Sequence, residues 1–494
     1  AAIARNFARL RYNILFPQTM YNGPPPNYVE LELQIVPFLA ATLYKVFGIH
    51  AIFGRLIAVA FSLATVATVA FFGRWLFHSR IAGLTAAYFY AVFPGSVYYG
   101  RTFMPDAAMA FFLTAALFAA AHYFVEDERL TAKSTVWVTA LLSLAYLAKP
   151  VAVLALVPLI AMGVDRARSG IRLQPLSATV ALIVPLLVLA IYDRAVDSHA
   201  QWHWASGITR LHVLPSLHDA LTSAGALATK LAEFHIMLGV LRDRLLGSIA
   251  FALAVAGVAV LPWSAPRSRS LLWAWLAGAL LYVFVVVTVE RVDYYMLPLL
   301  PLSALLIAGL AARFARMVRS AELAAAARYA LLAILPLVAL AALVYSRSPV
   351  AEYYAYNKAA YRNAVALDRS LPPDALLVIG HYGPDVQYYI DRFGWEEDPL
   401  LWTPFDEQSA IAKGSRYFVA IEANRLYRNI ELCAWLQRFP LIAAPGSWPV
   451  YVTDPAKADP NADRFWRAFR AAERAGRGRA FLDARGVCIT RSSP

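Results

Sequence analysis

The sequence predicts a mostly α-helical, polytopic membrane protein with a small α/β domain towards its C-terminal end. Hydrophobic residues make up 60% of the 494 residues, charged residues only 16%, and the mean hydropathy is +0.53. Apolar runs near the roughly 20 residues that cross a bilayer recur between residues 53 and 345. A soluble protein of this length would not have this composition.

Ten apolar segments are predicted to span the membrane. The segments are 53–73, 81–99, 107–125, 134–148, 150–164, 173–192, 246–263, 270–289, 294–312 and 329–345. The stretch 134–164 is interrupted by Lys149-Pro150. Because proline breaks a helix, this stretch is interpreted as two short helices that meet at Lys149 rather than one long helix.

The basic residues of the loops predict the orientation of these spans. One set of alternate loops holds thirteen Lys and Arg residues, whereas the short loops of the other set hold only Arg101, Lys149 and Arg291. The positive-inside rule places the first set in the cytoplasm and the second set outside. The same distribution accounts for the formal net charge of +13, so no nucleic-acid partner is expected.

Three regions lie outside the predicted spans. Residues 1–52 form a first outer loop with a helix in the membrane interface from Ile35 to Phe47, and residues 193–245 form a long outer loop within the transmembrane domain 53–345. Residues 346–458 have the composition of a soluble domain.

That last domain alternates helical and strand patterns. Helices are predicted at 357–369 and 384–391, and strands at 375–380, 417–421 and 450–452. This alternation is typical of a small α/β sandwich. The basic tail 459–494 is assigned no regular structure. Cys433 and Cys488 both lie in this part of the chain, where an oxidising compartment would permit a disulfide; two separate thiols are the alternative.

Ionisable residues near the outer helix ends are the candidate functional residues, because charge at membrane depth is costly. Glu30 and Glu32 share one face if their segment is extended, although a solvated edge is equally compatible. Asp106 opens an apolar helix, where an acidic N-cap is ordinary, and Arg101 is a natural ion-pair partner for it. Lys149 suits a phosphate, or it extends towards the interface without a ligand.

Two further outer loops contain candidate binding residues. Arg291 and the pair Tyr294 and Tyr295 form a tight hairpin that suits phosphate recognition, unless the tyrosines merely belong to the aromatic belt of the interface. His203, between two tryptophans, and Arg210 suit a sugar or a lipid headgroup, with packing as the alternative. A transporter would instead show charges near mid-span and internal repeats, and the sequence shows neither.

Taken in order, four stretches resemble the dolichyl-phosphate-mannose protein mannosyltransferase and aminoarabinose transferase group of the GT-C class of integral membrane glycosyltransferases. The resemblance covers most of residues 1–312, and the tail resembles the extra outer domain of bacterial members. The stretches are Ala4 to Phe7 leading to Asn13 to Gln18, Glu30 to Leu33 before Pro37 to Leu39, Arg101 to Asp106, and Tyr294 to Pro301.

The resemblance implies transfer of a sugar from a polyprenyl-phosphate carrier to a periplasmic lipid, glycan or protein. It assigns acidic roles to Asp106 and Glu32 and phosphate-side roles to Tyr295 and Arg291. It also implies a principal catalytic Asp and a first span ahead of Ala1, for eleven spans in all. Metal-linked members have a histidine where this chain has Gly207, so a divalent cation is left open.

The sequence therefore predicts an inverting glycosyltransferase of the bacterial inner membrane that works on the periplasmic side. Asp106 and Glu32 are predicted as catalytic residues. Arg101, Lys149, Arg291, Tyr294, Tyr295, Glu30, Arg210 and His203 are predicted to bind substrate. A transporter or flippase of lipid-linked sugars, or a membrane scaffold without catalytic activity, is the alternative.

Overall fold

The computed structural model of the chain describes all residues except 126–130, 171–173, 265, 323, 444–447 and 488–494. The chain divides into two compact units. The first consists essentially of residues 3–17 and 29–355, and the second of residues 18–28 and 356–494.

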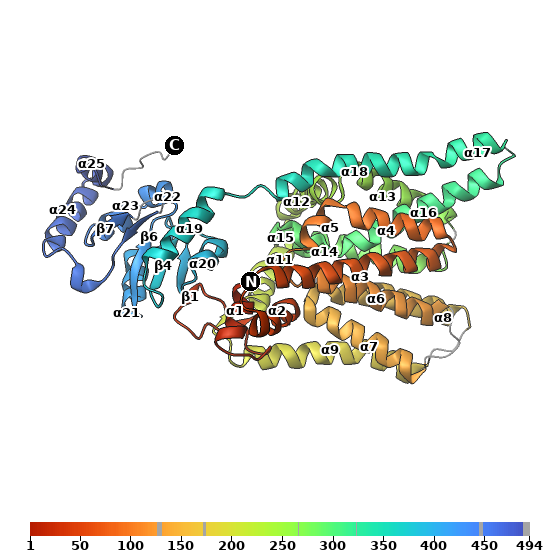
Figure 1. Ribbon diagram of the computed structural model, residues 1–494, viewed down its shortest axis with the longest axis horizontal. Helices are drawn as coiled ribbons and strands as arrows, with labels where there is room; N and C mark the ends of the chain where they lie inside the picture. Colours follow the sequence, from red (N-terminus) through yellow and green to blue (C-terminus); the bar gives the residue numbers. More distant parts are fainter. Residues whose placement is uncertain (126–130, 171–173, 265, 323, 444–447, 488–494) are drawn as a thin grey trace. The chain divides into compact units, whose positions relative to one another are not determined.

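The first unit is a bundle of long helices (Figure 1). Its main helices are α3 (Ile52–Phe77), α4 (Arg80–Val92), α6 (Asp106–Val125), α7 (Ala132–Ala148), α8 (Leu156–Arg168), α9 (Pro175–Asp197), α12 (Ala224–Val240), α13 (Ser248–Val260), α14 (Arg269–Tyr282), α16 (Leu299–Ser320), α17 (Ala325–Leu332) and α18 (Ile334–Tyr353). Within the described ranges, eight helices are long and apolar enough to cross a membrane. The prediction of a polytopic, mostly α-helical membrane protein is confirmed.

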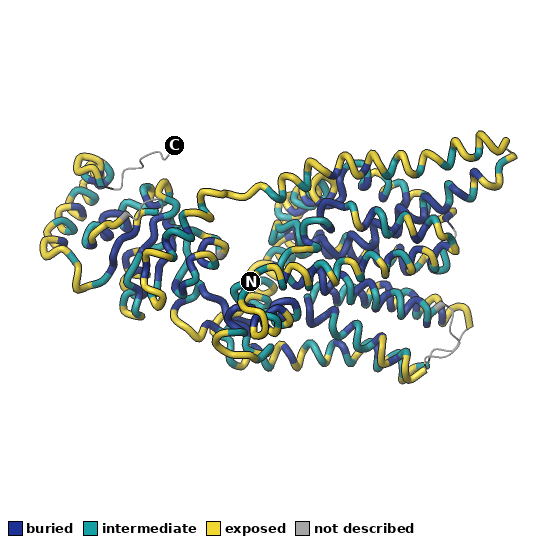
Figure 2. Tube along the Cα trace, viewed as in Figure 1, coloured by how far each residue is buried: buried dark blue, intermediate teal, exposed yellow. Residues whose placement is uncertain are grey.

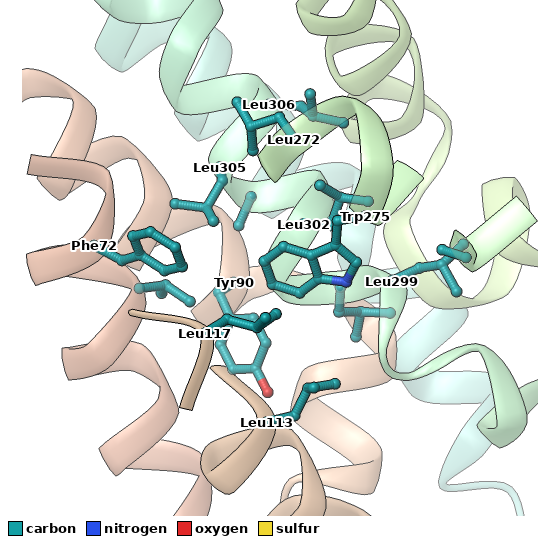
Figure 3. Close-up of a cluster of buried hydrophobic side chains, with 14 of the residues drawn as sticks. Phe72, Tyr90, Leu113, Leu117, Leu272, Trp275, Leu299, Leu302, Leu305 and Leu306 are labelled. Atoms are coloured by element: carbon teal, nitrogen blue, oxygen red, sulfur yellow. The ribbon is translucent and has the colours of Figure 1, made fainter. Parts of the chain in front are cut away.

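The bundle is apolar both inside and outside. Its core packs aromatic and leucine side chains from several helices, including Phe72 of α3, Leu117 of α6 and Trp275 of α14 (Figure 3). Outward-facing side chains are apolar as well: Ile183, Leu187 and Ile191 recur every four residues on α9 and are 46%, 55% and 70% exposed. Exposed residues recur along the outer helices of the bundle (Figure 2). Such a stripe is unfavourable in water and is the expected surface of a helix against lipid.

Lys149 separates two helices, as predicted. α7 ends at Ala148, Lys149 has an extended backbone (φ −162°, ψ 123°), and Pro150 begins the 3₁₀-helix η1 (Pro150–Ala155) that leads into α8. Proline has no N–H to continue the helix, so the chain reverses here. A second proline has a similar effect, because α4 ends before Pro94 and the predicted span 81–99 becomes α4 and α5 (Pro94–Tyr99).

Residues 193–245, predicted as a long outer loop between two spans, are largely helical. It contains the end of α9, the strand β3 (Trp202–His203), α10 (Ala205–Gly207), the π-helix η2 (Ile208–Val213), α11 (Leu214–Thr222), α12 and the π-helix η3 (Leu241–Leu246). Ser223 caps α12 by accepting a hydrogen bond from the Ala226 N–H. The apolar repeat of α12 was obscured by Lys230, Glu233 and His235, which interrupt it.

Short elements cover the end of the bundle that carries the candidate residues. These are α1 (Ala2–Arg9), β2 (Val29–Glu30), α2 (Ile35–Phe47), α15 (Thr288–Glu290) and the 3₁₀-helix η6 (Asp293–Met296). The helix α2 has the bounds predicted from the sequence. β2 pairs in parallel with β3, with Glu30 opposite His203.

The second unit is built on a six-stranded mixed sheet in the order β1-β5-β4-β6-β8-β7. The strands are β1 (Asn22–Gly23), β4 (Leu376–Gly380), β5 (Gly394–Glu397), β6 (Ser415–Val419), β7 (Leu441–Ala443) and β8 (Pro449–Tyr451). β4 lies between β5 and β6 and is parallel to both, whereas the outer pairs are antiparallel. The N-terminal segment 18–28 therefore supplies an edge strand, which the sequence did not predict.

Helices cover both faces of this sheet, because successive side chains of a strand point to opposite faces. Leu377 and Ile379 of β4 pack with α19 (Lys358–Ser370) and α20 (Pro384–Ile390), while Val378 packs in the other apolar cluster. That second cluster includes side chains of α21 (Pro404–Ala412), α22 (Ala423–Arg428) and α23 (Ile430–Leu436). The predicted α/β domain is confirmed.

The basic tail 459–494, to which the sequence analysis assigns no regular structure, contains two helices. Residues Ala462–Arg474 form α24 and Gly478–Asp483 form α25. Phe469 and Leu482 are fully buried in the second cluster, so the arginine-rich composition hid an apolar face. Cys433 is buried on α23. The prediction that it pairs with Cys488 falls outside the described residues, because Cys488 is not among them.

A buried carboxyl group makes the second unit sensitive to pH. Glu407 of α21 is 0% exposed, and its Oε2 accepts a hydrogen bond of 2.8 Å from Trp402 Nε1. Burial raises the pKa of Glu407 to about 8, with Asp406 adding to the effect. The folded state therefore holds the proton more tightly than the unfolded chain, so stability is greatest below the ordinary pKa and falls as the pH rises towards 8.

Replacing Glu407 by glutamine is expected to stabilise this unit by about 2–4 kcal/mol at pH 7.5, because one pKa unit corresponds to about 1.4 kcal/mol. The amide oxygen keeps the bond from Trp402, and no charge is buried. Thermal unfolding of the full chain at pH 5, 6.5 and 8 measures this, with Asp374→Asn, at an exposed carboxylate of the same unit, as control. A Glu407→Gln protein whose stability still falls with pH as in the wild type would contradict the assignment.

Candidate functional site

Lys149 is the centre of the candidate site. Its ammonium group forms an ion pair with the Asp106 carboxylate, and 12% of its side chain is exposed against 0% for Asp106. The extended backbone at the α7–η1 break directs this side chain to the start of α6. A lysine that is nearly buried, with its charge only partly surrounded by protein, is suited to bind an anion that enters the site.

Asp106 is buried because it opens α6 inside the bundle. Its Oδ1 contacts Lys149, while its Oδ2 is buried and has no hydrogen-bond partner in the described part of the chain. The expected alternative of a simple pair with Arg101 is wrong, because Lys149 takes that place and Arg101 instead lies over the ring of Tyr354. An acidic residue at a helix N-terminus is also favoured by the helix dipole.

Two tyrosines of η6 cover the other side of the lysine. The Lys149 Nζ is 4.7 Å from the centre of the Tyr294 ring and 4.8 Å from that of Tyr295. The two rings meet edge to face with centroids 5.1 Å apart. The face of an aromatic ring attracts a cation, so the hairpin holds the ammonium group without neutralising it.

Glu32 approaches the same place from the first outer segment. The Leu33 N–H donates to the Leu147 carbonyl at 2.7 Å, which fixes this segment to the end of α7, two residues before Lys149. Burial raises the pKa of the Glu32 carboxyl, the Lys149 ammonium opposes this, and the Asp106 carboxylate adds to it. Asp106, Lys149 and Glu32 therefore form one electrostatically coupled group.

Glu30 and His203 lie in a neighbouring contact that joins two outer segments. Glu30 Oε2 accepts from the Ser206 hydroxyl at 2.7 Å, and both carboxylate oxygens accept from the Ser206 N–H at 3.2 Å. His203 Nδ1 is 2.8 Å from Asp197 Oδ1 and 3.9 Å from Glu30 Oε2. These contacts attach the β3–α10 segment to β2, next to the group around Lys149.

The two remaining predicted arginines lie further out. Arg291 has a left-handed backbone (φ 54°), and its Nη2 is 2.8 Å from Glu233 Oε1 of α12. Arg210 is exposed on η2. Neither forms an ion pair with Asp106 or Glu32 in the described part of the chain. The structure thus brings together Asp106, Lys149, Glu32, Tyr294 and Tyr295, whereas Arg101 and Arg291 contact other residues and Arg210 is exposed.

Sequence reasoning missed the residues that support the hairpin. The carboxylate of Asp293, just before Tyr294, accepts hydrogen bonds from the hydroxyls of Tyr99 at 2.6 Å and Tyr353 at 2.5 Å. A pattern that could have found them is the repeated tyrosine pair, since Tyr98-Tyr99, Tyr294-Tyr295 and Tyr353-Tyr354 each occur next to a predicted outer helix end.

Among the residues that the structure describes, no group of three or more His, Cys, Asp or Glu side chains is arranged to hold a metal ion. The divalent cation that the resemblance left open at Gly207 stays a prediction from the sequence alone.

Comparisons with known proteins agree with the fold. Residues 34–192 match the sequence profile of the family described as dolichyl-phosphate-mannose-protein mannosyltransferase. A search of curated protein sequences finds no match. The matched residues include Asp106 and Lys149.

Two solved structures share the fold over 93% of this chain and 93% of their own. Both are ArnT from Cupriavidus metallidurans: the form bound to undecaprenyl phosphate, with a TM-score of 0.52 and 12% identity, and the apo form, with a TM-score of 0.52 and 13% identity. At this identity the likeness establishes the fold. The sequence similarity to the protein mannosyltransferase family is confined to residues 34–192, whereas the likeness of fold extends over nearly the whole chain.

Proposed function

We propose that this protein transfers a sugar from a polyprenyl-phosphate carrier to a lipid, glycan or protein acceptor, with inversion at the anomeric carbon. The observation that carries the proposal is the position of Lys149, whose ammonium group lies between a buried carboxylate and two tyrosine rings. This arrangement keeps a cation in place for a phosphate. The undecaprenyl phosphate bound to the similarly folded ArnT supports the same class of donor.

In the proposed reaction, a hydroxyl oxygen of the acceptor attacks the anomeric carbon of the donor sugar. A new C–O bond forms while the bond from that carbon to the carrier phosphate breaks, and the phosphate leaves with the electron pair. Lys149 stabilises the negative charge on the departing phosphate. The acceptor proton passes to a carboxylate, a role we assign to Glu32, whose raised pKa suits a proton acceptor. Asp106 positions Lys149.

The proposed location is the periplasmic side of the bacterial inner membrane. The loops on the side of Lys149 hold few basic residues, and the positive-inside rule places such loops outside the cytoplasm. The carrier's apolar chain remains in the bilayer, while Arg291 and Tyr295 border the position of its phosphate.

Turnover of a lipid-linked sugar tests the proposal. The full-length protein, reconstituted in liposomes, is given undecaprenyl-phosphate-linked hexoses and pentoses together with an envelope extract as acceptor source. We expect release of undecaprenyl phosphate and a labelled acceptor from the wild type, and at least a tenfold slower release from Asp106→Asn and Arg291→Ala, since charge-assisted hydrogen bonds contribute about 1.5–3 kcal/mol. Wild-type turnover in both variants would remove the proposed site.

The same liposomes distinguish the enzyme from a transporter or flippase. A transporter would move the intact lipid-linked sugar between leaflets and leave the bond between sugar and phosphate unbroken. Movement of the lipid-linked sugar between leaflets without release of undecaprenyl phosphate would therefore contradict the proposed function and favour a transporter or flippase. Neither movement nor release would favour a membrane scaffold.

A further inference from the structure

A cluster of tyrosines continues from the candidate site to the solvent. Tyr98 and Tyr99 of α5 meet Tyr353 and Tyr354 at the end of α18: Tyr98 stacks on Tyr353 with centroids 4.5 Å apart and meets Tyr354 edge to face at 5.6 Å. Tyr99 lies 6.0 Å from Tyr294, the ring that covers Lys149. In Figure 1, α5 and the last turns of α18 lie at the same end of the bundle. We call Tyr98, Tyr99, Tyr353 and Tyr354 the tyrosine cluster.

Two arginines lie over this cluster with their charges exposed. The Arg101 Cζ is 4.6 Å from the centre of the Tyr354 ring, and the Arg244 Cζ is 5.2 Å from that of Tyr353. Both arginine residues are exposed. A tyrosine ring beneath a guanidinium group restricts its orientation and leaves its N–H groups directed outwards, which favours binding of a planar or tetrahedral anion.

Among the described residues, Asp293 is the only carboxylate that contacts the tyrosine cluster, and it does not neutralise the charges of the two arginines. Asp293 accepts the hydroxyls of Tyr99 and Tyr353, and neither Arg101 nor Arg244 forms an ion pair with a carboxylate in the part of the chain that the structure describes. The neighbouring Arg242 contrasts with them, because its Nη2 is 2.6 Å from Asp243 Oδ2. Arg101 and Arg244 are therefore two oriented cations without a counter-charge next to the candidate site, and they are suited to bind an anionic ligand.

We infer that Arg101 and Arg244, held on the tyrosine cluster, bind a phosphate group of the acceptor substrate. The inference rests on the proposed function, because it assigns Lys149 to the carrier phosphate and this second subsite to the other substrate. Arg101, predicted from the sequence to bind substrate, is thereby assigned to the acceptor. Both arginines face water, where a hydrophilic acceptor approaches, and the Tyr99–Tyr294 contact connects them to the ring that covers Lys149.

The test measures the affinity of the full-length protein, in nanodiscs of phosphatidylcholine, for two phosphate compounds. The soluble probe is glucose 6-phosphate, with glucose as its uncharged counterpart, and the carrier probe is undecaprenyl phosphate. We expect Arg101→Ala and Arg244→Ala each to weaken binding of glucose 6-phosphate by about tenfold, since an Arg–phosphate hydrogen bond contributes about 1.5–3 kcal/mol. Binding of undecaprenyl phosphate is expected to change less than about twofold, within the uncertainty of such comparisons.

Arg242→Ala is the matched control, because it removes an exposed arginine of the same turn whose charge Asp243 already balances. It should leave both affinities at the wild-type value. Glucose 6-phosphate bound as tightly by Arg244→Ala as by the wild type would overturn the inference. Loss of both probes together in the arginine variants would overturn it too, because the cations would then serve the carrier.

A lipid headgroup is the other source of the same chemistry, and a second set of nanodiscs distinguishes it. Phosphatidylglycerol in place of part of the phosphatidylcholine should leave binding of glucose 6-phosphate unchanged if the subsite serves an acceptor. If phosphatidylglycerol competes with glucose 6-phosphate in the wild type but not in Arg244→Ala, the arginines bind lipid headgroups instead, and the inference is overturned. If the wild type itself does not bind undecaprenyl phosphate, the proposed function fails, independently of the arginine results.

Discussion

Replacement of Lys149 by methionine is expected to lower sugar transfer by about 10³-fold, because a preorganised charge at a leaving group contributes on that order. The expected loss is in kcat and in the affinity for undecaprenyl phosphate. The variant should also be less stable by about 3 kcal/mol, since it leaves the buried Asp106 carboxylate without its cation. Steady-state turnover and thermal unfolding of the same preparation measure the two effects.

A double substitution separates the two roles of the lysine. In Lys149→Met with Asp106→Asn no charge remains buried, so much of the stability should return. If Lys149 binds the carrier phosphate, this stable double variant still fails to transfer sugar and to bind undecaprenyl phosphate. Recovery of turnover together with stability would show that Lys149 serves only to neutralise Asp106.

The sequence could predict the elements of this site that depend on local patterns. Proline after Lys149 identifies the break between α7 and η1, the apolar runs identify the spans, and the distribution of loop charges puts Lys149 and Asp106 on one side. Their ion pair joins residues 43 positions apart. Topology makes this pair plausible but does not select it over Arg101, which is much nearer to Asp106 in the chain.

The supporting contacts could not be predicted in the same way, because no periodic pattern encodes them. The Asp293 carboxylate binds Tyr99, 194 positions away, and Tyr353, 60 positions away. These bonds exist only because α5, η6 and the end of α18 meet in three dimensions. The strand β1 is similar, since two residues without a strand pattern pair with β5 near the other end of the chain.

Glu32 is expected to set the acidic limb of the pH–rate profile. A base must be deprotonated, so turnover should rise with pH through the Glu32 pKa, which lies above its ordinary value. Replacing Glu32 by glutamine should lower kcat by about 10²–10⁴-fold, the usual contribution of a general base, and should remove the limb. Turnover of undecaprenyl-phosphate-linked sugar between pH 4.5 and 9 measures both.

The neighbours of Glu32 predict shifts of opposite sign. The Asp106 carboxylate raises the Glu32 pKa, so the residual activity of Asp106→Asn should have its limb at lower pH than the wild type. The Lys149 ammonium lowers that pKa, so the limb of Lys149→Met should move to higher pH. Glu30→Gln, two residues away and bonded to Ser206, should leave the position of the limb unchanged. Because a purely structural role of Glu32 would lower the rate equally at every pH, a limb that persists in Glu32→Gln would assign the base to another carboxylate.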